Sequence, residues 1–240
     1  MESENIALKR PERRNLLTSW TELLARYKEP ALIIDKFGKI VMVNAPAINI
    51  LRQPEENILG ENIEVLEGKI FDLAEKETRK KAFKDSGFYH GFVILQTFNK
   101  KEYLAEVNIN KLKISDSSYY IYEYMIDRKG HLNDYKTFIQ IKNEIYLNLR
   151  DIKLGTIVRK FNVPYSKIIY LFKHFEPTPP KKYINDLKIE KCKEMINEGR
   201  YNFKEIAYEL GFCDVSHLLK IFKKKINMTL NEYKNLGSRV

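Results

Sequence analysis

The chain has 240 residues, enough for two domains of ordinary size, and 42 basic against 32 acidic side chains give it a net charge of +10. Its longest apolar runs, such as residues 40–43 and 92–95, are far shorter than the roughly 20 residues of a membrane-spanning helix, and no apolar signal-peptide core stands near the start. The two cysteines, Cys192 and Cys213, lack metal-site or CxxC spacing. We therefore expect a soluble cytoplasmic protein without a disulfide framework, a bound metal or a membrane association.

The positive charge is concentrated in the second half of the chain. Residues 1–130 carry 21 Lys and Arg against 20 Asp and Glu, a net charge of +1, whereas residues 131–240 carry 21 against 12, a net charge of +9. A lysine-rich composition alone would also raise the charge. The uneven distribution of the positive charge makes the second half of the chain the candidate for binding a polyanion such as nucleic acid.

The first 28 residues predict a tail and a helix. Residues 1–14 are polar, with both signs of charge, and predict a disordered tail. Over residues 15–28, apolar side chains at spacings of three and four describe one face of a helix: Leu16, Trp20, Leu23, Leu24 and Tyr27. Two interpretations stay open, because this face can cover a following sheet or form half of a dimer interface.

The next hundred residues predict two strands, short helices and three further strands. Apolar runs around a glycine turn are typical of a hairpin, and the later runs alternate with a period of two. The first two predicted strands are residues 31–35 and 40–44. Three helices follow: residues 45–51, a short helix that ends at residues 57–60, and residues 71–84. The last three predicted strands are residues 89–98, 102–114 and 118–127.

Two stretches in this part resemble the opening of a PAS domain. They are GKIVMVNAPA, at residues 38–47, and ILGEN, at residues 58–62. The resemblance covers about residues 29–128 and implies a five-stranded antiparallel sheet with helices on one face. It further implies a small internal cavity and a role as a dimerising sensor.

The resemblance also implies a structural role for Asn44, whose side chain is expected to bond backbone groups and hold the following helix. His90, the only histidine of this part, stands at a strand start, so a haem ligand is not expected. No cysteine suited to a flavin photosensor lies here. No cofactor is evident, and any small-molecule ligand of the cavity is unknown.

The second half begins with an amphipathic helix and continues with an internal repeat. The helix over residues 135–150 can relay a signal, form the first core helix of this half, or do both. Residues 154–173 then parallel residues 203–223 at an offset of about 50, and each copy predicts a helix, a tight turn and a second helix. Positive φ at the turns is expected at Asn162 and Gly211. Pro164 suits the first turn of a helix, and Asp214 suits an N-cap.

A helix over residues 181–196 connects the two copies. Its sequence LKIEKCKEMI, the run IAYELGF at residues 206–212 and the run FKKKINMTLNEY at residues 222–233 resemble the AraC/XylS family of transcription regulators. The resemblance covers about residues 134–236. It implies two helix-turn-helix units that bind double-stranded DNA, an activating role, and RNA polymerase as a further candidate partner.

Four residues depart from the family pattern: Asn227, Leu230, Pro177 and Val158. Asn227 replaces a glycine but tolerates positive φ. Val158 is bulkier than the usual alanine and Pro177 lacks an N–H group. We therefore expect the first unit to sit at a slightly altered angle.

The second helix of each unit is expected to bring its N-terminal residues to base edges and lysines to phosphates. The candidate base contacts are Tyr165, Ser166, Lys167 and Tyr170 in the first unit and Asp214, Val215, Ser216, His217, Leu219 and Lys220 in the second. The candidate phosphate contacts are Lys173, Lys223, Lys224 and Lys225. By periodicity, the core positions of these helices are Ile168, Leu171, Phe172, Leu218, Ile221 and Phe222. Cys192 is expected to be buried on the inner face of the connecting helix.

The sequence therefore predicts two domains: a tail and flanking helix over 1–28, an α+β PAS-like domain over 29–128, and an all-α double helix-turn-helix domain over 129–240. No catalytic residue or metal ligand is predicted, because no motif of an enzyme occurs. We expect a DNA-binding regulator that forms a homodimer through the PAS-like domain and its flanking helix. The alternative is a non-enzymatic adaptor, or a ligand-binding sensor, that uses the helix-turn-helix units to dock proteins.

Overall fold

A computed structural model describes residues 19–67, 79, 82, 85–114, 117–176 and 178–237 of the chain. The described residues form two compact units, which meet in the chain between Asn133 and Asp134. The predicted tail, the start of the flanking helix, Pro177 and most of the predicted helix 71–84 lie outside the described residues. Among the described residues, no helix is both long and apolar enough to cross a bilayer.

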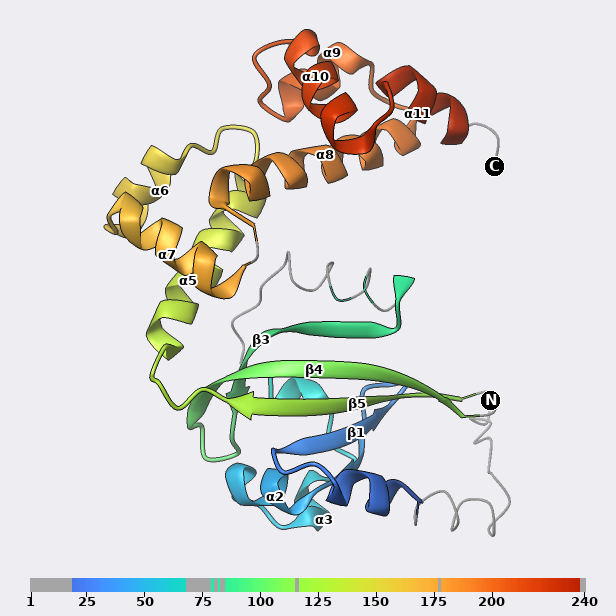
Figure 1. The fold of residues 1–240 in the computed structure, drawn as a ribbon, viewed down its shortest axis with the longest axis vertical. Helices are drawn as coiled ribbons and strands as arrows, with labels where there is room; N and C mark the ends of the chain where they lie inside the picture. The colour runs from blue at the N-terminus through green and yellow to red at the C-terminus, as the bar shows by residue number, and fades with distance from the viewer. Residues whose placement is uncertain are drawn as a thin grey trace. The chain divides into compact units, whose positions relative to one another are not determined.

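The first unit contains a five-stranded antiparallel sheet in the order β2-β1-β5-β4-β3 (Figure 1). Its strands are β1 (Ala31–Asp35), β2 (Ile40–Val43), β3 (Phe88–Gln96), β4 (Glu102–Ile114) and β5 (Ser117–Ile126). Every strand ends within two residues of its predicted bounds. The predicted α+β class and the five-stranded antiparallel sheet are confirmed.

The two faces of the sheet are covered by different segments. Leu32 and Ile34 of β1 face the larger core, which α2 (Ala45–Leu51), α3 (Glu55–Ile58) and the 3-10 turn Ile63–Val65 complete. Because side chains alternate along a strand, Ile33 faces the opposite side. There, helical residues 19–25 bury Trp20 and Leu24 against the sheet. The described part of the flanking helix therefore covers the sheet, as the first of its two interpretations proposed.

Asn44 joins three segments of the first unit. Its Oδ1 accepts hydrogen bonds from the backbone N–H groups of Ala31, at 2.9 Å, and Ala47, at 3.0 Å. Its Nδ2 donates to the backbone carbonyls of Tyr27, at 3.3 Å, and Glu29, at 2.9 Å. The side chain is buried and is the N-cap of α2. The expected structural role of Asn44 is confirmed.

The second unit is all α-helical, as predicted, and contains two helix-turn-helix units (Figure 1). Its helices are α5 (Leu132–Leu147), α6 (Leu154–Phe161), α7 (Tyr165–Phe175), α8 (Pro180–Glu198), α9 (Phe203–Glu209), α10 (Val215–Ile226) and α11 (Leu230–Gly237). The helix α8 connects the two helix-turn-helix units. The prediction that α5 continues to Arg150 is wrong, because a turn closed by the Asp151 N–H and the Asn148 carbonyl follows Leu147.

The predicted core positions of α7 and α10 are buried, except that Ile221 is only partly buried. Phe172 of α7 and Phe138 of α5 pack edge to face, with ring centroids 5.2 Å apart. Six residues of α5 are buried in all, so α5 is a core helix of this unit.

We predict that Asn44→Asp destabilises the first unit by about 3 kcal/mol or more, because a carboxylate would face two backbone carbonyls in a buried site. Urea unfolding followed by the fluorescence of Trp20, the chain's one tryptophan, measures the change. The control is Asn57→Asp, since the exposed Asn57 side-chain amide donates to the Gln53 side chain and to no other group within the described part of the chain. Equal unfolding midpoints for the two variants would contradict the assigned role.

Candidate nucleic-acid interface

The turn of each helix-turn-helix unit depends on one residue with positive φ. Asn162 follows α6 with φ of 49°, and Gly211 follows α9 with φ of 62°. Both turn predictions are confirmed. Pro164 is the N-cap of α7 rather than part of its first turn, whereas Asp214 is the predicted N-cap of α10 and accepts the His217 N–H at 2.7 Å.

The turn of the second unit is packed against the loop that follows α5. A Cβ added at Gly211 would lie 1.8 Å from the carbonyl oxygen of Arg150, so only glycine fits there. The Arg150 guanidinium lies 3.9 Å from the ring centroid of Tyr208 in α9. The Nζ of the buried Lys188 donates to the Gly211 carbonyl at 3.2 Å, and burial lowers the pKa of this lysine. These contacts orient α10 relative to the rest of the unit.

The second helices of the two units expose the same positions. Each helix presents an exposed row of side chains opposite its buried face. The row starts at a serine and continues with the residues three, four and seven positions after it. We call these rows the α7 stripe, formed by Ser166, Ile169, Tyr170 and Lys173, and the α10 stripe, formed by Ser216, Leu219, Lys220 and Lys223. Each residue of the α10 stripe stands 50 positions after its counterpart in the α7 stripe.

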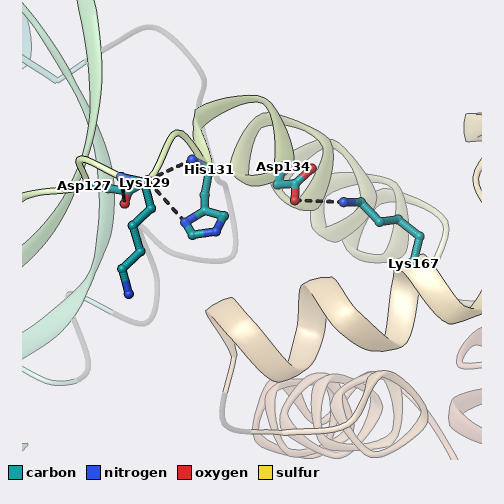
Figure 2. A network of polar contacts seen from close by, with 5 residues as sticks. All are labelled: Asp127, Lys129, His131, Asp134 and Lys167. Carbon is teal, nitrogen blue, oxygen red and sulfur yellow. Dashed lines mark hydrogen bonds and ion pairs between the residues drawn. The ribbon is translucent and has the colours of Figure 1, made fainter.

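Among the candidates of the first unit, Tyr165, Ser166 and Tyr170 are exposed on α7. Lys167 is partly buried, and its Nζ lies 2.7 Å from Oδ2 of Asp134 in α5 (Figure 2). Sequence reasoning missed Ile169, which is 37% exposed in the middle of the stripe. Its spacing of three residues from Ser166 was the available signal.

Among the candidates of the second unit, Ser216, Leu219 and Lys220 lie on the α10 stripe. His217 is exposed next to it, with its ring packed edge to face on Phe212. The other two candidates have structural contacts: the Asp214 carboxylate caps α10, and Val215 is partly buried against the core. The stripe therefore presents two of the exposed lysines of α10 beside a serine and a leucine.

The candidate phosphate-binding lysines divide into two groups. Lys173, Lys223 and Lys224 are exposed on their helices. Lys225 is also exposed, but it forms an ion pair with Asp186 of α8, at 2.7 Å, on the side of α10 that faces α8. Its positive charge is thus partly neutralised within the protein.

Polar groups also lie inside the N-terminal compact unit, which contains the five-stranded sheet. The Tyr124 hydroxyl is buried and has no hydrogen-bond partner among the described residues. Burial raises the pKa of Tyr124, and the nearby Glu67 carboxylate adds to this effect. Glu67 in turn pairs with Arg79 at 2.8 Å. His90 lies elsewhere, on the partly exposed opposite face of the sheet, where it contacts Asn108 and Glu106.

The carboxylate of Asp127 binds backbone groups of the segment between β5 and α5 (Figure 2). Asp127 accepts the backbone N–H groups of Lys129, at 2.9 Å, and His131, at 2.8 Å. Burial raises the pKa of Asp127, but these hydrogen bonds and the neighbouring His131 lower it further than burial raises it. The net pKa lies below the ordinary value, so the carboxylate keeps its charge in the native turn.

The two cysteines lie in contrasting surroundings. Cys192 is fully buried in α8, and burial raises the pKa of its thiol to about 12. Cys213 is exposed in the turn before α10. No group of three or more potential metal ligands occurs among the described residues.

Residues 157–235 match a family model described as a helix-turn-helix domain. The chain is 28% identical over 100 residues to an uncharacterized HTH-type transcriptional regulator, YdeC, of Bacillus subtilis (strain 168). That match covers 41% of this chain and 34% of the relative, so the chain spans about a third of the length of this curated relative.

Two solved structures are similar to separate parts of the chain. An AraC-type transcriptional regulator from Chromobacterium violaceum is 17% identical, with a TM-score of 0.41, over 44% of this chain and 95% of that one. The PAS domain of an HTR-like protein from Haloarcula marismortui is 19% identical, with a TM-score of 0.39, over 50% of this chain and 100% of that one.

We predict that only Cys213 reacts when the native protein is treated with an aromatic disulfide reagent at pH 8, because the thiolate is the reacting form and Cys192 stays protonated and buried. The released chromophore should correspond to one thiol per chain, and to two after unfolding in guanidinium. Cys213→Ser should abolish the native reaction. Rapid native modification of Cys192, identified by mass spectrometry, would contradict its burial.

Proposed function

We propose that this chain, whose C-terminal region is a helix-turn-helix domain of the AraC type, is a transcription regulator that binds specific sites on double-stranded DNA. The observation that carries the proposal is the pair of matching stripes. Two helices on one connecting helix expose equivalent positions, and both stripes combine hydrogen-bonding, apolar and basic side chains. Such a combination suits base edges flanked by phosphates.

In this mechanism, α7 and α10 each enter the major groove with their N-terminal residues leading. Two units in one chain then address two groove segments separated by about one helical turn, roughly 34 Å. Ser216 and Lys220 are suited to hydrogen bonds with bases, and Leu219 and Ile169 to thymine methyl groups. Lys173, Lys223 and Lys224 contribute attraction to phosphates, which does not depend on sequence and weakens with salt.

The N-terminal part, residues 29–128 with the flanking segment 1–28, is proposed to sense a signal or to dimerise the regulator, and residues 129–240 to bind DNA. The buried Tyr124 hydroxyl supports a sensing role, because a small ligand with a hydrogen-bonding group would satisfy it. Activation of transcription, with RNA polymerase as the partner, rests on the family resemblance.

Selection of bound duplexes from a random DNA pool, using the full chain at two salt concentrations, tests the proposal. We expect enrichment of two short sequence blocks about one helical turn apart. Inverted or repeated copies of this pair would support a homodimer. Salt-sensitive binding without enrichment would reduce the protein to an unspecific polyanion binder, and the absence of binding would favour the adaptor alternative.

We predict that Lys223→Gln weakens binding to the selected duplex and lowers the magnitude of the slope of log K against log salt by about 0.9, the value for one phosphate contact. Lys225→Gln is the matched control, since Lys225 pairs with Asp186 away from the α10 stripe. Fluorescence anisotropy at several salt concentrations measures both slopes. Equal changes for the two variants would show that total charge, rather than the stripe, determines binding.

A further inference from the structure

Lys167 differs from the lysines of the α7 stripe and the α10 stripe because a carboxylate from another helix, Asp134 of α5, pairs with it. It lies in the first turn of α7, where a recognition helix approaches base edges. Its Nζ lies 2.7 Å from Asp134 Oδ2 (Figure 2). The same Nζ lies 4.6 Å from the ring centroid of Tyr170. Tyr170 belongs to the α7 stripe, so the ammonium group stands at the edge of that stripe.

The pair is neither fully buried nor fully solvated. The Lys167 side chain is 35% exposed and the Asp134 side chain 28% exposed. A contact of this kind contributes little to stability, because water and salt screen it. An approaching phosphate or guanine can therefore compete with Asp134 for the ammonium group at a modest cost.

In the first helix-turn-helix unit, carboxylates of α5 pair with two lysines. Lys160 of α6 pairs with Glu144 of α5, as Lys167 pairs with Asp134. In the second helix-turn-helix unit, Lys225 pairs with Asp186 away from the stripe, and no ion pair of Lys220, Lys223 or Lys224 occurs among the described residues. Lys223 does help to lower the pKa of the exposed Glu232 carboxyl. The α5 helix thus lowers the positive charge that the first unit can offer to DNA, whereas the α10 stripe keeps its charge.

We propose that Asp134 is a positioning residue that sets the affinity and the base preference of the first unit by competing with DNA for the Lys167 ammonium group. This inference rests on the proposed function. With the pair formed, the α7 stripe meets DNA mainly through Ser166, Ile169 and Tyr170. With the pair broken, Lys167 adds one cation to the stripe, suited to a phosphate or to the O6 and N7 atoms of guanine.

The test compares full-length variants on a duplex carrying the selected blocks. Asp134→Asn keeps the shape of the side chain and removes its charge, and Asp134→Glu keeps the charge. Asp186→Asn is the matched control, because it makes the same charge change beside Lys225, away from the stripe. Circular dichroism verifies that each variant retains the helical content of the wild type.

We expect Asp134→Asn to bind about two- to fivefold more tightly at low salt, the factor that corresponds to loss of a partly exposed ion pair. Its slope of log K against log salt should become steeper by about 0.9. Repeating the duplex selection should show a changed preference in one sequence block only. Asp134→Glu should behave like the wild type, and Asp186→Asn should change neither the preference nor the slope by this amount.

A double-mutant cycle with Lys167→Gln identifies the lysine involved. In the Lys167→Gln background, Asp134→Asn should produce no more change than Asp186→Asn does. A full effect of Asp134→Asn in that background, or equal effects of the two Asp→Asn variants, would overturn the inference while leaving DNA binding established. Failure of the wild type and every variant to bind any duplex would overturn the proposed function and this inference together.

Discussion

The burial of one face of α7 and of α10 determines which side chains the C-terminal half exposes for binding. Ile168, Leu171 and Phe172 of α7 are buried, and Phe172 packs on Phe138 of α5. The counterparts 50 residues later in α10 pack in a core with α8 and α9. A helix with one buried face exposes the opposite face in a fixed orientation. Apolar packing therefore sets the position of the two stripes. Because the stripe side chains are exposed, their residue types can differ between the two helices without changing the packing.

The two stripes have the same geometry and different charge. Lys173 is the one lysine of the α7 stripe, and the neighbouring Lys167 is paired; the α10 stripe carries Lys220 and Lys223. Attraction to phosphates is long-ranged and independent of sequence, whereas contacts from Ile169 and Tyr170 require close approach. Under the proposed function, the second unit is therefore expected to contribute more of the sequence-independent attraction to DNA than the first.

Periodicity and turn chemistry made most of the fold predictable. The five strands and the helices of both units came from local patterns, and the role of Asn44 came from its place in a resembling motif. Local patterns could not show the end of α5 at Leu147, because the loop that follows is shaped by contacts with Gly211 and Tyr208, about 60 residues later. Ile169, by contrast, was within reach of local patterns, because it stands three residues after the exposed Ser166.

The sequence predicted which face of each helix is exposed, but it did not predict which lysines on the helices form ion pairs. Lys167 and Lys225 both satisfied the sequence criteria, but their partners, Asp134 and Asp186, stand 33 and 39 residues earlier and approach through tertiary packing. A lysine's value for binding DNA depends on whether its charge is already satisfied, which spacing along one helix does not encode. The proposed role of Asp134 also depends on tertiary packing. It stands in the first turn of α5, where an acidic side chain is favourable for the helix itself, and packing of α5 beside α7 places that carboxylate next to the recognition surface.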